Sequence, residues 1–152
     1  GPALLPTWLA VIVGLLLLSV RPLTTLHIIR SGFDSVGHGL GIYTVYPDEG
    51  TAVSAEIYSY IRHPMYLGSL CAAVAFASFR NNAEAVLVAS LLSVPIVIEI
   101  GLEDREMMER CGEERREYIQ RTGALFPKPG KAWGFVRLLL FLEDRGGQGN
   151  EM

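Results

Sequence analysis

Two short polar stretches in this sequence stand directly beside long apolar segments. The first is Tyr60–Gly68, "YIRHPMYLG", and the second is the acid pair Glu103-Asp104. The residue before a proline avoids the helical region, so we expect His63 to be extended. Proline is favoured at the first position of a helix, so we expect Pro64 to begin one. The next two backbone amides would then lack partners within the helix and form an anion site.

The paired acids Glu103 and Asp104 follow an apolar block, so we expect them at or near a membrane surface. Acidic side chains there are costly unless they have a function or face water. An anion site and a carboxylate near one interface together suit a zwitterionic cofactor with a positive centre. Two simpler interpretations stay open. In the first, Arg62 is only a snorkelling charge beside a helix that begins with proline. In the second, Glu103 and Asp104 only begin a solvated helix.

Three uncharged apolar blocks must position these residues, at 1–20, 64–79 and 85–98. The first has about the length that a bilayer requires, roughly 20 residues, and it either ends at Arg21-Pro22 or kinks there and continues. Only "RNN" (80–82) separates the second from the third, which predicts a helical hairpin. We therefore predict an all-α integral membrane protein with at least three transmembrane helices, including the hairpin, and a cytoplasmic cofactor-binding C-terminal region. Buried helices of a soluble protein are the alternative.

Composition and charge limit the kinds of partner that we expect for this chain. The net charge of −3 gives no support to a nucleic-acid partner. The two cysteines form no CxxC motif and no Cys/His cluster, so we expect no metal site. Of the 13 Lys and Arg residues, three lie between the first and second blocks, nine follow the third, and one lies in the hairpin turn. For a multi-pass membrane protein, the positive-inside rule therefore predicts that the two large polar segments, and with them the candidate cofactor site, face the cytoplasm.

The chain divides into three predicted segments. Residues 1–30 form an N-terminal transmembrane helix, and further spans could precede it because the chain starts Gly-Pro without an initiator methionine. Residues 31–128 form the catalytic membrane core with the hairpin. Within it, "GHGLG" (37–41) permits a phosphate-loop interpretation, although a flexible glycine-rich turn explains it more simply. Residues 129–152 form an interfacial helix, "WGFVRLLLFL", and a flexible tail.

The order of these motifs resembles the integral-membrane methyltransferases related to isoprenylcysteine carboxyl methyltransferase and to phospholipid N-methyltransferases. The resemblance rests on "IYSYIRHPMYLG" (57–68) and "LEDREMMERCGEERREYIQRTGALFPK" (102–128), and it covers about residues 50–128. That family has the pattern Arg-His-Pro-x-Tyr-x-Gly, a helical hairpin, Glu-Glu-x-x-Leu, Gly-x-x-Tyr and a final proline. It uses S-adenosylmethionine, so the resemblance implies this cofactor.

The resemblance also implies which residues contact the cofactor. They are the "GTAV" segment, a tyrosine upstream of the helix start, the "HPMY" motif and the first paired acid: Gly50, Thr51, Ala52, Val53, Tyr58, His63, Pro64, Met65, Tyr66 and Glu103. Glu103 would bind the amino group of the cofactor, and the helix-start amides would bind its carboxylate. Aromatic faces would lie near its positive charge.

The chain departs from the family pattern at several positions. Asp104 replaces the second glutamate, Met107 replaces leucine, and Arg115 stands where the family often has tyrosine. The carboxyl methyltransferases have an arginine four residues before the acid pair, and here that position is Glu99. Arg105 is the candidate substitute. These departures leave the cofactor assignment intact and leave the acceptor open among prenylated cysteine, a phospholipid amine and another lipophilic small molecule.

We expect in-line methyl transfer to a lipophilic acceptor that arrives from the bilayer, with membrane lipids as neighbours and Glu103, Glu99 and Arg105 as candidate catalytic residues. A carboxylate acceptor needs no general base, whereas an amine must lose a proton, for which Glu99 and Glu103 are the candidates. Two other interpretations are an NADPH-dependent sterol-type reductase, which has a similar Arg-His-x-x-Tyr-x-Gly element, and a non-catalytic membrane scaffold. The "HPMY" motif and the acid pair favour methyl transfer over both.

Overall fold

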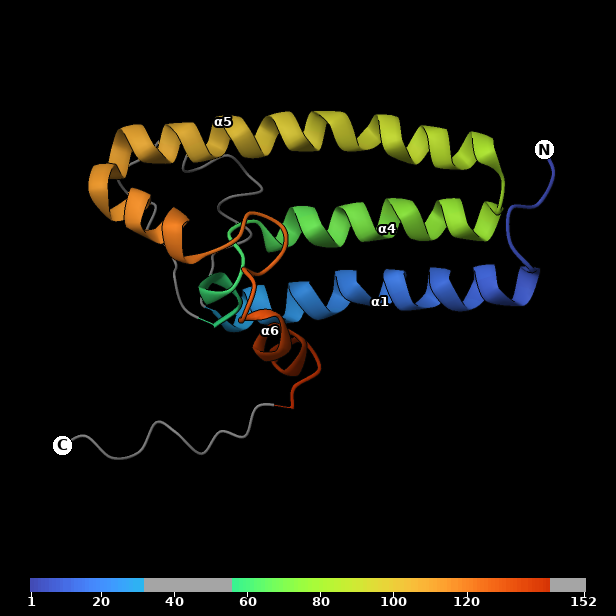
Figure 1. Ribbon diagram of the computed structural model, residues 1–152, viewed down its shortest axis with the longest axis horizontal. Coiled ribbons are helices and arrows are strands. Elements are labelled where there is room, and N and C mark those ends of the chain that lie inside the picture. The colour runs from blue at the N-terminus through green and yellow to red at the C-terminus, as the bar shows by residue number, and fades with distance from the viewer. Residues whose placement is uncertain (32–55, 143–152) are drawn as a thin grey trace.

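The computed structural model describes residues 1–31 and 56–142, and within these ranges the regular structure is helical. The helices are α1 (Thr7–Arg30), the short 3-10 helix η2 (Glu56–Ser59), α4 (Pro64–Arg80), α5 (Ala83–Arg121) and α6 (Ala132–Leu139). α1, α4 and α5 run antiparallel to their neighbours, with α4 in the middle (Figure 1). For the described residues, this confirms the predicted all-α architecture and the helical hairpin, which is formed by α4 and α5.

α1 and α4 pack closely because small residues line the faces that meet. A Cβ atom on Gly68 would lie 2.7 Å from Thr24 Oγ1 and 3.3 Å from the Cα atom of Arg21, so the two backbones come very near each other there. A Cβ atom on Gly14 would overlap the ring of Phe79. Small residues permit this approach where helices associate in apolar surroundings. The glycines therefore fix the distance between α1 and α4.

Two of the described helices, α1 and α5, are long and apolar enough to cross a membrane. α1 continues through Pro22 instead of ending there, which gives it 24 residues. Many of the apolar side chains on these helices are exposed, for example Leu16 at 65% and Leu91 at 61%. An apolar surface of this extent indicates a non-aqueous neighbour. α4 has 17 residues and lies between them, so the third predicted span stays a prediction.

Two asparagines form the turn between α4 and α5. Asn81 ends α4 in the left-handed conformation, with φ 49° and ψ 41°. Asn82 precedes α5, and its side chain accepts a hydrogen bond from the Ala85 amide at 2.8 Å. The side chain of Asn81 also accepts hydrogen bonds from the amides of Leu4 and Leu5. Asparagine suits both positions, because it tolerates positive φ and caps helix starts.

α5 consists of two halves of opposite character. The apolar half (83–102) contains only two charged residues, Glu84 and Glu99. The charged half (103–121) reverses direction at Gly112, whose φ of 55° and ψ of −127° lie outside the helical region. Figure 1 shows the end of α5 folding back toward the start of α4. A residue with a Cβ atom is strained in this conformation. The sequence predicts the charged continuation of the helix but not its reversal.

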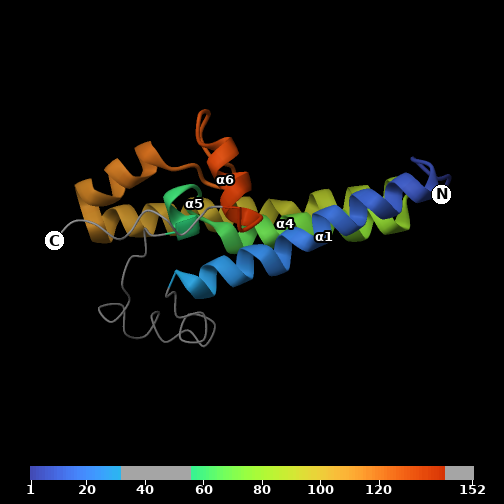
Figure 2. The ribbon, with the colours of Figure 1, turned by 90° about the horizontal axis from the view of Figure 1, so that it is seen from below.

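A small buried core joins the segments at the end of the bundle where α4 begins. Its residues come from α1, η2, the connector to α4, α4 itself and α6: Ile28, Ile57, Tyr58, Ile61, Leu67, Phe135 and Leu138. Burying a large apolar side chain contributes about 1.5–3 kcal/mol. α6 runs across the bundle rather than along it (Figure 2). The core therefore holds η2 and the start of α4 against the end of α1.

Candidate functional site

The start of α4 has the backbone conformation predicted from the sequence. His63 is the residue before the helix, with φ −122° and ψ 62°, and Pro64 is the first residue of α4. The amides of Met65 and Tyr66 follow, at positions that have no hydrogen-bond partner within a helix. The partial positive charge at a helix start adds to their attraction for an anion. This end of α4 is therefore suited to a carboxylate or phosphate group.

The segment after α5 (122–124) pairs with the segment before α4 and holds the helix start in place. The amide of Arg62 donates to the Gly123 carbonyl at 2.8 Å, and the amide of His63 donates to the Ala124 carbonyl at 3.0 Å. A Cβ atom on Gly123 would overlap a nearby carbonyl oxygen, so this turn requires glycine. Hydrogen bonds between backbone groups thus hold the segment before α4 and the segment after α5 together.

The side chain of His63 lies between the two acids of the Glu103-Asp104 pair. Its Nδ1 atom is 3.5 Å from Glu103 Oε2, and its Nε2 atom is 3.2 Å from Asp104 Oδ1. The imidazole is buried, with 3% of the side chain exposed. Two parts of the molecule that the sequence analysis assigns to one ligand, the helix start and the acid pair, therefore meet in the structure.

The two acids have different surroundings. The side chain of Glu103 is 38% exposed, and it also interacts with the hydroxyl group of Tyr66. The side chain of Asp104 is 16% exposed, and both of its oxygens accept hydrogen bonds from arginine. Glu103 is therefore the more accessible of the two acids, whereas Asp104 is engaged by its neighbours.

Asp104 is the centre of an ion cluster that also contains Arg62, His63, Glu103 and Arg115. Arg62 donates to Asp104 Oδ2 from Nη2 at 2.9 Å and from Nε at 3.2 Å. Arg115 donates from Nη2 to Asp104 Oδ1 at 2.6 Å. The Nη1 group of Arg62 also donates to the carbonyl oxygen just after α5, at 2.7 Å. Charge-assisted contacts of this kind are short and directional, so they define the relative positions of these segments.

The sequence does not predict this ion cluster. From the sequence, Arg62 is only a positive charge at an interface, Asp104 a mild replacement, and Arg115 a departure from the family pattern. The two arginines lie 42 and 11 residues from Asp104 along the chain, so no local pattern connects them. The only signal is Gly112, because an isolated glycine within a helical pattern disfavours a continuous helix.

The ion cluster shifts the pKa values of its members in opposite directions. Burial alone raises the pKa of Asp104, but His63 and Arg62 lower it by more, so the pKa of this carboxyl lies well below its usual range. Burial alone lowers the pKa of His63, but Asp104 and Glu103 more than offset this, so the pKa of the imidazole lies above its ordinary value. The cluster therefore favours an ionised Asp104 beside a protonated His63.

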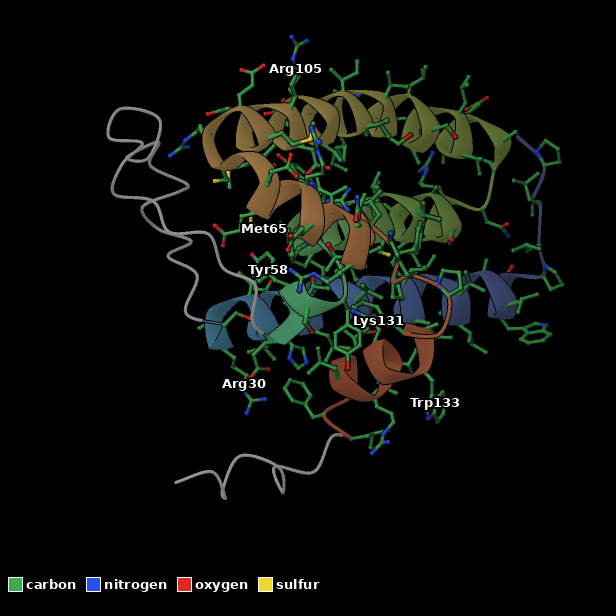
Figure 3. The ribbon with its side chains drawn as sticks, turned by 60° about the vertical axis from the view of Figure 1, so that its left-hand side comes forward. Arg30, Tyr58, Met65, Arg105, Lys131 and Trp133 are labelled. Atoms are coloured by element: carbon green, nitrogen blue, oxygen red, sulfur yellow. The ribbon has the colours of Figure 1, made fainter. Side chains whose placement is uncertain are left out.

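Tyr58, a predicted cofactor contact, lies in η2 next to the charged half of α5 (Figure 3). The hydroxyl of Tyr118 donates to the Tyr58 carbonyl at 2.6 Å, which ties η2 to the charged half. The phenol of Tyr58 is buried, and burial, followed by the charges of Tyr118 and Glu103, raises its pKa. Its hydroxyl group therefore stays neutral near neutral pH.

The structure does not bring every predicted site residue to the ion cluster. The side chain of Arg105 is 76% exposed, pairs with Glu109 at 3.2 Å and projects away from α4 (Figure 3). Glu99 is exposed on the apolar half of α5, near enough to Tyr66 for an electrostatic interaction. The "GTAV" residues Gly50–Val53 lie outside the described residues.

Arg21 supports the start of α4 from the other side. This residue lies in the apolar helix α1, and its Nη1 group donates to the Met65 carbonyl at 3.0 Å and to Ser69 Oγ at 2.8 Å. Charged residues within such helices are rare and almost always paired. From the sequence, Arg21 has no role beyond ending or kinking the first span.

Among residues 1–31 and 56–142, no group of three His, Cys, Asp or Glu side chains could hold a metal ion.

Comparison with known proteins gives a family match and several relatives. Residues 9–113 match the phospholipid methyltransferase family. Methanethiol S-methyltransferase 1 of Bradyrhizobium diazoefficiens is 38% identical over 72 residues, which are 47% of this chain and 24% of the relative. The methanethiol S-methyltransferase of Pseudomonas sp. (strain GM41(2012)) is 32% identical over 89 residues, 58% of this chain and 33% of the relative. The methanethiol S-methyltransferase of Pseudomonas deceptionensis is 34% identical over 82 residues, which are 53% of this chain and 30% of the relative.

The chain spans about a third or less of the length of these relatives. No solved structure matches it. The family match takes in α1, α4 and α5 as far as the reversal at Gly112, and it therefore includes the start of α4 and both acids. It covers more than half of the chain and confirms the resemblance to membrane methyltransferases. The chain belongs to the phospholipid methyltransferase family.

Proposed function

We propose that this chain is an S-adenosylmethionine-dependent methyltransferase whose acceptor is lipophilic and reaches the site from the membrane. The observation that carries the proposal is the position of Glu103, 3.5 Å from His63, at the start of α4. A partly exposed carboxylate thus stands beside backbone amides that attract an anion. A ligand with both an ammonium and a carboxylate group fits this pair, and the amino-acid moiety of S-adenosylmethionine has both.

The described residues fit this cofactor. The amides of Met65 and Tyr66 would hold its carboxylate, and Glu103 would hold its ammonium group. Tyr58 and the segment Gly50–Val53 are further contacts, proposed from the family resemblance. When bound, the cofactor supplies an activated methyl group. The residues of the chain bind it, orient it toward the acceptor and exclude water.

For the acceptor, we propose a small lipophilic thiol. The relatives are named for the methylation of methanethiol. Glu99 stands where the carboxyl methyltransferases have the arginine expected for an acceptor carboxylate. A thiol becomes a good nucleophile when it loses its proton, and Glu99 or Glu103 would receive that proton. The alternative acceptor is a phospholipid amine, which needs the same proton transfer.

We also propose that α4 crosses the membrane together with α1 and α5, which would place the ion cluster at the cytoplasmic interface. The excess of Lys and Arg in the two large polar segments supports this orientation. α6 would lie in the interface. Trp133 is 71% exposed and points away from the bundle (Figure 3), while Lys128, Lys131 and Arg137 supply positive charge.

The fluorescence of Trp133 tests this placement of α6. The chain has two tryptophans, so the Trp8→Phe variant leaves Trp133 as the sole reporter. In liposomes, lipids brominated near the headgroup should quench Trp133 more than lipids brominated near the end of the acyl chain. Quenching by neither lipid would show that α6 stays in water.

Isothermal titration of the purified chain with S-adenosylmethionine tests the cofactor. Glu103→Gln should weaken binding roughly 10- to 100-fold, because a hydrogen bond to a charged group contributes about 1.5–3 kcal/mol. Glu106→Gln is the matched control, since the side chain of Glu106 is 69% exposed and pairs with Arg110 at the surface. Binding of NADPH instead would favour the reductase alternative, and binding of neither would reject an enzyme of either class.

Mass spectrometry of the products tests the acceptor. Methanethiol, phosphatidylethanolamine and a prenylated cysteine are each offered with S-adenosylmethionine to the reconstituted chain. The thiol proposal predicts dimethyl sulfide as the main product, at a rate that depends on Glu99 or Glu103. Methylated phosphatidylethanolamine as the main product would show that the acceptor is the phospholipid amine and not a thiol. The proposed cofactor would be unaffected.

A further inference from the structure

Arg115 reaches the ion cluster from beyond the reversal at Gly112. Its Nη2 atom lies 2.6 Å from Asp104 Oδ1, eleven residues earlier in the same helix. In a straight helix, residues this far apart are separated by about 16 Å along the axis. The contact therefore exists only because α5 folds back, and it holds the folded-back segment against the rest of the helix.

Asp104 connects this contact to the start of α4. Its Oδ1 atom accepts from Arg115, and its Oδ2 atom accepts from Arg62 at 2.9 Å. Arg62 belongs to the segment directly before α4. Both guanidinium groups are largely buried, with 9% of the Arg62 side chain and 10% of the Arg115 side chain exposed. One carboxylate thus joins the helix start to the parts of α5 on both sides of the reversal at Gly112.

The same carboxylate controls the surroundings of Glu103. Asp104 is the chain neighbour of Glu103, and the two acids face opposite nitrogens of the His63 ring. While Arg115 is present, the charge of Asp104 Oδ1 is shared by Arg115 at 2.6 Å, His63 at 3.2 Å and the Nε group of Arg62 at 3.3 Å. Without Arg115, Oδ1 would be left with His63 and the longer contact from Arg62 Nε, and the folded-back segment would lose its contact with Asp104. Glu103 would then no longer be fixed beside the helix start.

We propose that Arg115 is a positioning residue for cofactor binding, which acts through Asp104 to hold Glu103 and His63 against the start of α4. The inference rests on the proposed function, because the group that Glu103 receives is the ammonium of the cofactor. Arg115 itself does not touch the cofactor. Arg115 lies far from the helix start along the chain, so no pattern of neighbouring residues indicates this role.

Three variants of the full chain distinguish positioning from general stabilisation. Arg115→Gln removes the charge. Arg115→Lys keeps the charge and removes the Nε–H group, which has no acceptor among the described residues. Arg116→Gln is the matched control, because the side chain of Arg116 is 65% exposed and pairs with Glu113 at the surface.

Isothermal titration with S-adenosylmethionine gives the first readout. Arg115→Gln should raise the Kd about 10- to 100-fold, because a displaced Glu103 would lose its charge-assisted contact with the cofactor, as in Glu103→Gln. Arg115→Lys should stay within about fivefold of the parent, because one charge-assisted contact is kept. Arg116→Gln should match the parent. The inference is overturned if Arg115→Gln binds as tightly as the parent, or loses affinity only in proportion to its unfolded fraction.

The imidazole of His63 gives a second readout that needs no cofactor. NMR titration of the ligand-free protein should show a higher pKa for His63 in Arg115→Gln, because one of the two guanidinium groups that compete with the ring for Asp104 is then absent. Glu103, Tyr66 and Arg62 face or adjoin the ring in both proteins. An unchanged titration would overturn the link through Asp104. If the parent binds no cofactor but the titration shifts as expected, the proposed function fails while the action of Arg115 on the cluster stands.

A double variant tests whether Arg115 acts through Asp104. In the Asp104→Asn background, Arg115→Gln should change the Kd by less than about twofold, because the two side chains belong to one pathway. Fully additive effects would show that Arg115 acts on the site by another route, and would overturn the inference.

Discussion

The two halves of α5 belong to one helix, yet different interactions hold them in place. The apolar half lies along α4 and exposes side chains such as Leu91 and Val97, at 61% and 59%. The charged half meets the start of α4 through Asp104 and Arg115, whose side chains are 16% and 10% exposed. Apolar surface therefore positions the first half, and specific pairs of charges position the second.

This difference indicates where the chain tolerates substitution. Apolar side chains that face lipid have no directional partners, so one can replace another at little cost. Charges that are largely buried need their own partners, because removing one leaves the others uncompensated. We therefore expect the effects of substitution to be large in the charged half and small on the exposed face of the apolar half.

Asp104→Asn should have the largest effect on stability. It leaves Arg62 and Arg115 without their shared carboxylate, and breaking a buried ion pair in this way costs about 3–5 kcal/mol. Since Asp104 is partly exposed, we expect about 3 kcal/mol, measured as the free energy of unfolding in detergent by circular dichroism. Glu106→Gln, on the exposed face of the same half, should change it by less than about 0.5 kcal/mol. Equal effects of the two variants would contradict the comparison.

Gly112→Ala should have the next largest effect. The φ of 55° and ψ of −127° at this position are strained for a residue with a Cβ atom, at a cost of about 1–3 kcal/mol. Cofactor affinity should fall with stability, because the reversal brings Arg115 to Asp104. Gly101→Ala is the matched control, since it lies within the apolar half and its added Cβ atom would meet nothing within 4 Å. A Gly112→Ala protein as stable as Gly101→Ala would show that the reversal is not required.

The pH dependence of stability should have two limbs, one for each shifted group in the ion cluster. Because the pKa of Asp104 is lowered by folding, its contribution is present above its unfolded pKa of about 3.9 and is lost as the pH falls toward the folded value. Because the pKa of His63 is raised, its contribution is present below about 6.5 and is lost as the pH rises through the folded value. Thermal unfolding between about pH 3 and pH 9 should show both.

Substitutions at these two residues assign the limbs. Asp104→Asn should flatten the acid limb, and His63→Gln should flatten the alkaline limb. An acid limb that persists unchanged in Asp104→Asn would assign it to carboxyl groups outside the cluster.

Leu91→Ala should have the smallest effect, below about 0.5 kcal/mol, because the side chain is 61% exposed on the apolar half. Ile100→Ala is the comparison within the same half, since Ile100 is 8% exposed and its truncation should cost about 2 kcal/mol or more. The same unfolding measurement applies to both. A large loss for Leu91→Ala would mean that this face has a protein partner rather than lipid.

The sequence predicts those features of the site that follow from local rules. Proline at 64 predicts both the helix start and the non-helical His63 before it. The "RNN" turn predicts the hairpin, and the hairpin returns the chain to the same end of the bundle, where Glu103 meets His63. Each step depends on a few neighbouring residues whose conformational preferences agree.

The remaining features depend on contacts between distant segments, for which the sequence has no local pattern. The reversal at Gly112 sets which arginine reaches Asp104, and the pairing of 122–124 with the segment before α4 has no marker except the glycine at 123. Arg105 shows that closeness in the sequence does not guarantee closeness in space. It lies one and two residues from the acids, and side chains so close in a helix sequence do not share a face.

The turn at Asn81 and Asn82 has a consequence for Glu103, although it lies at the opposite end of the bundle (Figure 1). α4 runs for 17 residues from Pro64 to this turn, and α5 runs back from it to Glu103. Each residue in either arm advances the helix by about 1.5 Å and rotates it by about 100°. One inserted residue would therefore turn Glu103 to another face and change its level relative to the helix start. For the proposed cofactor site, the number of residues in each arm therefore matters as much as the identity of the acid.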